Sequence, residues 1–181
     1  MRNDTSHLKI VFAGSVGAGK STSIQAVSDI DVICTEEATS DEWRLRKDLT
    51  TVAMDYGQMN LDDGTKIHIY GAPGQQRFSF MWEILANGAL GVILLVDDTA
   101  PNPLGEIEFY LKAFAAQLES RSLVIGITRS DLNSRHDLDV YRRLVASYDP
   151  TLPVFTIDAR ESRQVKTLTR ALLYRIDPWL H

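Results

Sequence analysis

The chain has 181 residues, of which 44% are hydrophobic and 24% charged, so it is long enough to bury a core and has an ordinary globular composition. A net charge of −5 argues against non-specific nucleic-acid binding, and a single cysteine excludes an internal disulfide. The longest apolar run, residues 88–96, is too short to span a bilayer, and neither end shows a signal segment or a lipidation motif. We therefore expect one domain over residues 1–181, in the cytoplasm, with no lipid anchor and no nucleic-acid partner.

The hydrophobic pattern predicts strands that alternate with helices. The predicted strands cover residues 7–13, 51–61, 65–70, 89–96, 123–127 and 152–157. The predicted helices cover residues 20–28, 79–87, 104–119, 137–147 and 162–176. Asp62-Asp63-Gly64 is a hairpin turn signal, so the strands on either side of it should be antiparallel. The sequence therefore predicts an α/β fold with a mainly parallel six-stranded sheet, one antiparallel edge strand, and helices on both faces.

A glycine-rich segment between the first strand and the first helix has the sequence GSVGAGKS, which matches the phosphate-loop pattern G-x-x-x-x-G-K-[ST]. Its glycines allow successive backbone N–H groups to converge on phosphate oxygens at a helix N-terminus. Lys20 would place its charge on the β- and γ-phosphates, and the Ser21 hydroxyl would ligate Mg²⁺. The residues expected to surround the phosphates are Gly14, Ser15, Val16, Gly17, Ala18, Gly19, Lys20, Ser21 and Thr22. The segment predicts binding of a nucleoside triphosphate.

Five further segments resemble motifs of the Ras-like small GTPases and occur in the same order as in that family. They are residues 51–56 (switch threonine and following strand), 70–78 (D-x-x-G-Q-E-R-F), 88–99 (fourth strand), 128–131 ([NT]-K-x-D) and 158–160 (S-A-K). Together with the phosphate loop, they extend the resemblance over nearly the whole chain. The resemblance implies a P-loop GTPase G domain that binds GTP and GDP with Mg²⁺.

The same resemblance assigns roles near the phosphates. Gln75 matches the glutamine that positions the attacking water, and Gly74 matches the glycine whose amide touches the γ-phosphate. Thr51 matches the switch threonine that joins Ser21 in binding Mg²⁺. The implied catalytic residues are therefore Gln75, Lys20 and Thr51, and the implied metal ligands are Ser21 and Thr51.

On the base side, an aspartate can accept hydrogen bonds from guanine N1–H and N2–H₂, whereas adenine has no such donor pair. Asp131 should therefore select guanine, while the backbone N–H of Ala159 would suit guanine O6. Arg129 replaces the lysine of the family, but its aliphatic stem and flat guanidinium can still lie along the base. The other base-site residues implied by the resemblance are Thr128, Asp158 and Arg160.

One departure from the family pattern affects the metal. Gly71 stands where most small GTPases have the aspartate that binds Mg²⁺ through water. Some bacterial Ras-like proteins also lack this aspartate, among them the gliding-motility polarity GTPases and the conservon-type GTPases of actinobacteria, and residues 71–75 resemble their G-T-P-G-Q variant. Asp97 or Asp98 could act as a substitute, although a helix cap or a loop salt bridge is the simpler role for Asp97.

Other departures concern the rate of hydrolysis. Val16 stands at the loop position where Ras-like proteins often keep a small residue beside the γ-phosphate, so the resemblance predicts that a branched side chain there slows GTP hydrolysis. The polarity GTPases carry an arginine directly before the switch threonine, and Thr50 stands there in this chain. Arg44, Arg46 and Lys47 lie upstream and could supply an arginine finger in cis, but a solvated charged loop is the simpler interpretation of these residues.

The sequence therefore predicts a regulatory switch that cycles between GTP and GDP with slow, Mg²⁺-dependent hydrolysis. Two alternatives remain open: a nucleotide-holding scaffold without turnover, and a P-loop phosphotransferase. The resemblance to the bacterial branch also implies a Roadblock-type regulatory dimer as the partner. It would dock on the switch segments, where Phe80 and Trp82 are the candidate anchors.

Overall fold

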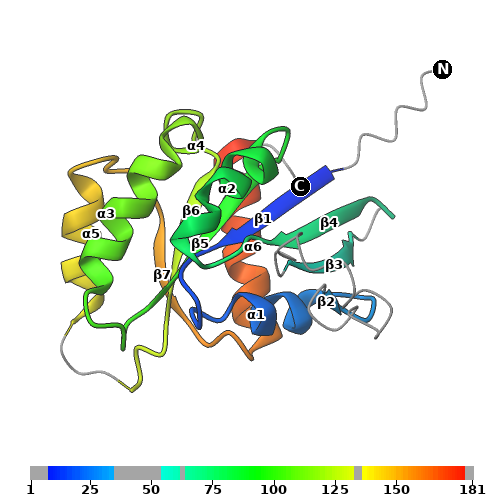
Figure 1. Ribbon diagram of the computed structural model, residues 1–181, viewed down its shortest axis with the longest axis horizontal. Helices are drawn as coiled ribbons and strands as arrows, with labels where there is room; N and C mark the ends of the chain where they lie inside the picture. Colours follow the sequence, from blue (N-terminus) through cyan, green and yellow to red (C-terminus); the bar gives the residue numbers. More distant parts are fainter. Residues whose placement is uncertain (1–7, 35–53, 62–63, 133–135, 178–181) are drawn as a thin grey trace.

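The computed structural model describes residues 8–34, 54–61, 64–132 and 136–177. Its seven strands form one sheet in the order β2-β3-β4-β1-β5-β6-β7 (Figure 1). The strands are β1 (Leu8–Ala13), β2 (Ile33–Cys34), β3 (Asp55–Asn60), β4 (Lys66–Gly71), β5 (Gly91–Asp97), β6 (Leu123–Thr128) and β7 (Val154–Ile157). The helices are α1 (Lys20–Val27), η1 (Gln76–Phe78), α2 (Ser79–Ala86), α3 (Pro103–Ala113), α4 (Ala115–Glu119), α5 (Leu138–Ala146) and α6 (Ser162–Ile176).

Alternation along the central strands distributes the apolar side chains between two cores. Ile10 and Phe12 of β1 belong to the core beneath α1 and α6, whereas Val11 and Ala13 belong to the core beneath α2, α3 and α5. All four side chains are fully buried. The sheet is therefore covered by helices on both faces, as Figure 1 shows, and the predicted fold class is confirmed.

Strand directions also agree with the prediction. β3 pairs with β4 in antiparallel register, with Asn60 opposite Lys66 and Asp55 opposite Gly71. β4, β1, β5, β6 and β7, neighbours in that order, run parallel to one another. The carboxyl ends of these parallel strands therefore meet at one edge, where the phosphate loop and the segments at residues 70–78, 128–131 and 158–160 begin.

Two details differ from the sequence prediction. The sheet has a seventh strand, β2, which is only two residues long and gives no periodic signal. The helix expected over residues 104–119 is divided at Phe114 into α3 and α4. Phe114 is 1% exposed and stacks near Trp82, so the chain turns where this ring enters the core.

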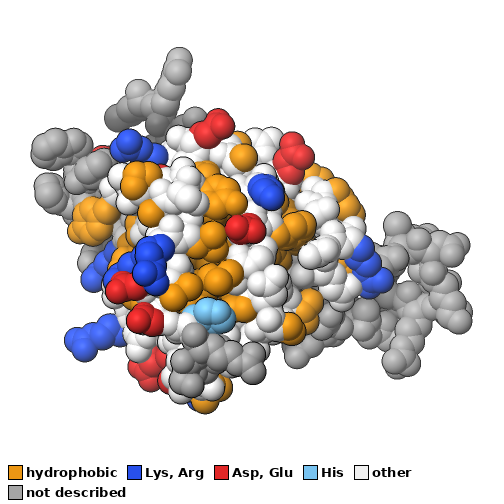
Figure 2. All heavy atoms as spheres, turned by 90° about the vertical axis from the view of Figure 1, so that its left-hand side faces the viewer, with side chains coloured by type: hydrophobic (Ala, Val, Ile, Leu, Met, Phe, Trp, Pro, Cys, Tyr) orange, Lys and Arg blue, Asp and Glu red, His pale blue; other side chains and the backbone are white. Residues whose placement is uncertain are grey.

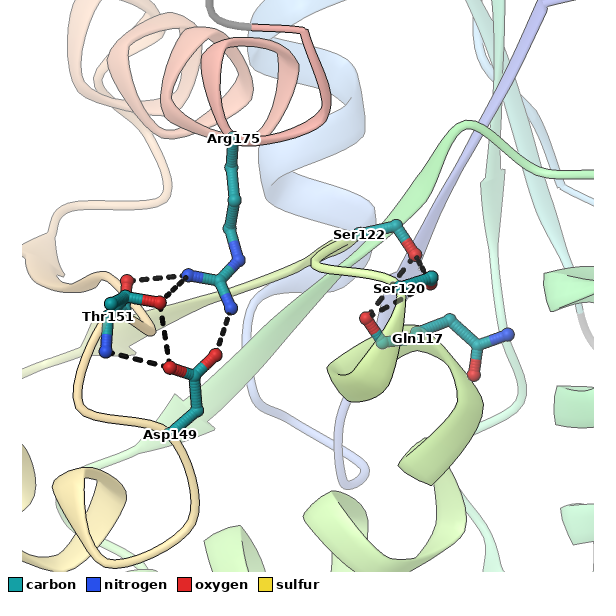
Figure 3. Close-up of polar contacts among 6 residues, drawn as sticks. All are labelled: Gln117, Ser120, Ser122, Asp149, Thr151 and Arg175. Carbon is teal, nitrogen blue, oxygen red and sulfur yellow. Dashed lines mark hydrogen bonds and ion pairs between the residues drawn. The ribbon is translucent and has the colours of Figure 1, made fainter.

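At the opposite edge of the sheet, polar contacts fix the loops that lead into β6 and β7 (Figure 3). The guanidinium of Arg175 on α6 donates to the Asp149 carboxylate and to the carbonyl and hydroxyl oxygens of Thr151. Partial burial raises the pKa of Asp149, but hydrogen bonds from Thr151 and Arg175 outweigh it and lower the pKa overall. The hydroxyls of Ser120 and Ser122 lie 2.7 Å apart in the turn before β6. The contacts of Arg175 connect the end of α6 to the loop before β7.

The face that carries α3 and α5 leaves some apolar side chains in contact with solvent. Phe109 and Tyr148 are each 38% exposed. Figure 2 shows apolar side chains gathered on this face with charged side chains around them. Among the described residues, no helix is long and apolar enough to cross a membrane.

Candidate nucleotide-binding site

The phosphate-loop segment lies between β1 and α1, the context that its sequence pattern requires. Gly17 and Gly19 have φ angles of 83° and 97°, a region that disfavours residues with a side chain. Gly19 is the N-cap of α1, and no side chain caps this end of the helix. The backbone N–H groups of the first turn are therefore available to an anion.

Lys20 is held at the mouth of this loop. Its Nζ donates to the carbonyl oxygens of Gly14 and Ser15 at 2.8 and 2.7 Å. Burial lowers the pKa of Lys20 to about 8, and the negative charges of Asp55 and Glu106 oppose that shift. A phosphate group beside Nζ would favour the charged form of this partly desolvated amine.

A cleft of about 300 Å³ opens beside the loop and brings together residues from four segments. Six of the predicted site residues line it: Val16, Gly17, Lys20, Ser21, Gly74 and Gln75. The other lining residues were not among the predicted site residues: Cys34, Asp55, Ala72, Pro73, Arg77 and Phe78. Thr51 lies outside the described residues, as do Arg44, Arg46 and Lys47.

Asp55 lies beside Gly71, which stands where most small GTPases have an aspartate. Ser21 Oγ donates to Asp55 Oδ2 at 2.5 Å. Asp55 pairs with Gly71 across the β3–β4 ladder, and a Cβ on residue 71 would lie 3.1 Å from Asp55 Oδ2. The carboxylate therefore reaches Ser21 from β3 instead of from the end of β4. The sequence contained one signal for this: counting the hairpin outward from the turn at residues 62–64 places residue 55 opposite residue 71.

Asp97 and Asp98, the substitutes considered from the sequence, are engaged elsewhere. Asp97 forms an ion pair with Arg129 and accepts hydrogen bonds from the backbone N–H and the hydroxyl of Thr99. Asp98 is fully buried and accepts a hydrogen bond from the Tyr141 hydroxyl. Neither residue lines the cleft that contains Ser21, and the loop salt bridge at Asp97 is confirmed.

A second cleft, of about 310 Å³, contains all the residues predicted to hold the base. It is lined by Gly19, Thr22, Thr128, Arg129, Asp131, Leu132, Asp158, Ala159 and Arg160. A Cβ on Gly19 would lie 3.0 Å from the Cβ of Ala159, so the phosphate loop forms part of the wall of both clefts. Thr128 Oγ1 donates to the carbonyl oxygen of Ala18 at 3.0 Å and fixes the end of β6 against the loop.

Both arginines of the second cleft are paired with carboxylates. Arg129 is bound to Asp97. Arg160 makes a two-point contact with Asp158, with Nε 2.9 Å from Oδ1 and Nη2 2.7 Å from Oδ2. The hydrogen bonds from Arg160 lower the pKa of Asp158 to about 2. The hydrogen bonds to Asp158 and the charge of that carboxylate raise the pKa of Arg160, and the negative charge of Asp131 adds to the rise.

One predicted docking anchor is part of the core. Trp82 is 2% exposed, its Nε1 donates to the Pro73 carbonyl oxygen at 2.7 Å, and its ring centroid lies 4.8 Å from that of Tyr110. The prediction that Trp82 anchors a partner is therefore wrong. Phe80 is 58% exposed, as a surface residue should be, and Ile84, one helical turn later, is 62% exposed.

The donors in the first cleft fit a magnesium ion better than a transition metal. Among the described residues, no group of three or more His, Cys, Asp or Glu side chains could hold a metal alone. Ser21 and Asp55 instead offer a hydroxyl and a carboxylate beside the space that phosphates would enter. Mg²⁺ prefers such oxygen ligands and commonly takes the rest from phosphates and water.

Comparisons with known proteins agree with a nucleotide-binding role. A family model described as a conserved hypothetical ATP-binding protein matches residues 29–173, a range that begins after the phosphate loop. A protein of Methanocaldococcus jannaschii described as uncharacterized is 34% identical over 136 residues, which are 74% of this chain and 77% of that protein. The Ras-related protein Rab-1C of Dictyostelium discoideum is 26% identical over 164 residues, which are 87% of this chain and 75% of that protein. The chain therefore belongs to the family of conserved hypothetical ATP-binding proteins, with a distant likeness to the P-loop GTPases.

Proposed function

We propose that this protein is a guanine-nucleotide switch that binds GTP and GDP with Mg²⁺ and hydrolyses GTP slowly. The proposal rests on one observation: two clefts adjoin the same phosphate loop. One cleft contains Lys20, Ser21 and Gln75, and the other contains Asp131. A nucleotide laid across Gly19 would place its phosphates in the first cleft and its base in the second.

Guanine is proposed as the base although the family description names ATP. Asp131 is exposed in the second cleft and can accept two hydrogen bonds from the guanine edge. Adenine has no matching donor pair, so its binding would leave a desolvated carboxylate without partners. The Ala159 backbone, on the same wall, would serve guanine O6.

The position of Gly74 supports a switch with two states. A Cβ on this residue would lie 2.6 Å from the Val16 nitrogen and 2.9 Å from Lys20 Nζ. Gly74 therefore lies directly against the groups that would bind the terminal phosphate. A γ-phosphate next to Lys20 needs that volume, so residues 71–75 must shift when the triphosphate binds and can return after hydrolysis.

Mg²⁺ would be held in this proposal by Ser21 and Thr51, with the Asp55 carboxylate supporting Ser21. When bound, the ion would reduce the charge on the β- and γ-phosphates. The Asp55 carboxylate accepts a hydrogen bond from the Ser21 hydroxyl and so orients the Ser21 oxygen. Lys20 would bind the phosphates directly, and Gln75 would orient the attacking water.

The finer assignment is also a proposal. Residues 71–75 favour the bacterial branch of Ras-like proteins, and with it a Roadblock-type dimer as the regulatory partner. Phe80 and Ile84, both more than half exposed on α2, are the surface to which such a dimer would dock. A dimer that reads the switch must bind the GTP-analogue and GDP forms with different affinities, and equal affinities would rule this partner out.

The proposal is tested by titrating the purified protein with fluorescent GTP, GDP and ATP, with and without Mg²⁺, followed by single-turnover assays. We expect GTP and GDP to bind at least about 30-fold more tightly than ATP, as the loss of a charge-assisted hydrogen-bond pair implies. We also expect GTP to be converted slowly to GDP. Equal binding of ATP would overturn the base assignment. Tight binding without turnover would favour the scaffold, and turnover only with an added acceptor would favour the phosphotransferase.

A further inference from the structure

Arg77 places a second cation on the wall of the cleft that contains Lys20. It belongs to η1 and follows Gln75, the predicted water-positioning residue, by two positions. Its guanidinium carbon lies 4.8 Å from the centre of the Phe78 ring. Stacking on a ring face restricts the planar group while its N–H edges stay available for oxygen acceptors.

The other arginines near the two clefts are already committed. Arg129 is paired with Asp97, and Arg160 is paired with Asp158. Among the residues that the structure describes, no ion pair joins Arg77 to a carboxylate. Lys20 and Arg77 are the cationic residues that line the first cleft in this part of the chain. Arg77 is therefore the guanidinium best placed to meet a phosphate there.

Phosphoryl transfer gives such a group a specific task. Negative charge spreads over the γ-phosphoryl oxygens in the transition state, and an arginine supplied in cis or in trans raises the hydrolysis rate about 10³- to 10⁵-fold. A P-loop lysine alone leaves much of this charge uncompensated, and Val16 already predicts a slow site. Arg77 lies two positions after residues 71–75, the segment that must shift when the triphosphate binds. An arginine there would reach the γ-phosphate only in the triphosphate state.

We propose that Arg77 is a catalytic residue, an arginine finger supplied in cis by the segment that also carries Gln75. This inference rests on the proposed GTPase function. In the step, the oxygen of a water oriented by Gln75 forms a bond to the γ-phosphorus while the bond from that phosphorus to the bridging oxygen breaks. GDP keeps the electron pair of the bridging oxygen, and a proton of the water passes to the released phosphate. Arg77 donates N–H groups to the γ-phosphoryl oxygens during this exchange.

The test compares Arg77→Ala and Arg77→Lys with the parent in single-turnover GTP hydrolysis. Arg170→Ala is the matched control, because Arg170 is an exposed arginine on α6 that lines neither cleft. Affinity for a non-hydrolysable GTP analogue and binding of GDP with aluminium fluoride are measured in parallel. The second measurement reports transition-state complementarity without depending on turnover.

We expect Arg77→Ala to slow hydrolysis at least about 100-fold and to abolish the aluminium fluoride complex, since the charge that stabilises the transition state is lost. The affinity for the GTP analogue should stay within about threefold, because the contact strengthens mainly in the transition state. Arg77→Lys should recover only part of the rate, because an ammonium lacks the planar fork. Arg77 is exposed, so the variants should unfold at the parent temperature.

A parent that hydrolyses GTP at the same rate as Arg77→Ala would overturn this inference and leave the proposed function intact. A parent that binds GTP without any turnover would overturn both the inference and the hydrolytic part of the proposed function. An equal loss in rate and in analogue affinity would also contradict a finger, because it would make Arg77 a residue for ground-state binding.

Discussion

Replacing Asp55 by alanine should lower the affinity for the Mg²⁺ that supports nucleotide binding. The carboxylate accepts the Ser21 hydroxyl at 2.5 Å and fills the space beside Gly71. A charge-assisted hydrogen bond contributes about 1.5–3 kcal/mol, which corresponds to roughly 10- to 150-fold in affinity. Residues that orient a metal ligand typically change metal affinity about 10- to 100-fold when they are removed. The two estimates agree on a shift of one to two orders of magnitude.

The assay follows release of a fluorescent GDP analogue while the Mg²⁺ concentration is varied. For Asp55→Ala, the midpoint should move about 10- to 100-fold towards higher Mg²⁺, while release in EDTA should match the parent. Glu119→Ala, which removes an exposed carboxylate on α4, serves as the control and should not shift the midpoint.

Moving the carboxylate from residue 55 to residue 71 makes the test stricter. Gly71→Asp alone should be harmful, because its Cβ would lie 3.1 Å from Asp55 Oδ2 and two carboxylates would share one place. Combining Asp55→Ala with Gly71→Asp removes that conflict and should recover much of the Mg²⁺ dependence. An unchanged midpoint in Asp55→Ala, or a double variant no better than Asp55→Ala, would refute the reasoning.

Three other predictions concern the phosphates and the stability of the fold. Lys20→Ala should abolish triphosphate binding, whereas Gln75→Leu should keep the affinity for GTP and slow its hydrolysis. Single-turnover hydrolysis at the parent rate in Gln75→Leu would contradict the water-positioning role. Gly74→Ala should impair return to the described conformation, because the added Cβ would lie 2.6 Å from the Val16 nitrogen, and limited proteolysis of the GDP form should then differ from that of the parent. Arg175→Ala should lower the free energy of unfolding by about 3 kcal/mol, since it breaks an ion pair whose side chains are 6% and 17% exposed. In chemical denaturation, the free energy of unfolding of the control Arg170→Ala should stay within about 0.5 kcal/mol of the parent value. Because the pKa of Asp149 is lowered in the folded protein, the ion pair stabilises the protein above the ordinary carboxyl pKa near 3.8 and loses that effect as the pH falls below it. The free energies of unfolding of the parent and of Arg175→Ala should therefore converge in acid.

The fold could be predicted because its signals are local. β5 and β6 are continuous apolar runs between turn signals, and the Asp-Gly turn fixed the direction of β3 against β4. β2 gave no signal because two residues show no period. The break at Phe114 follows from how one ring packs against the core, and helical spacing cannot reveal that.

The candidate site could be predicted only where it is built from contiguous motifs. The phosphate loop and the segments at residues 128–131 and 158–160 carry their residues in fixed local order, and the structure brings them to two adjoining clefts. Asp55 was missed because its role depends on the register between two strands. Arg77 was missed because its availability depends on which carboxylates the other arginines already hold.

The central claim is that Asp131 reads guanine, and the most direct measurement is a competition between GTP and XTP in the parent and in Asp131→Asn. Xanthine carries a carbonyl where guanine has its N2 amine, so an amide donor at residue 131 should suit it while the parent carboxylate should not. We expect the parent to prefer GTP and the variant to prefer XTP, with each preference at least about 30-fold. A variant that kept the parent preference for GTP would contradict the assignment of the base site and, with it, the proposed guanine-nucleotide switch.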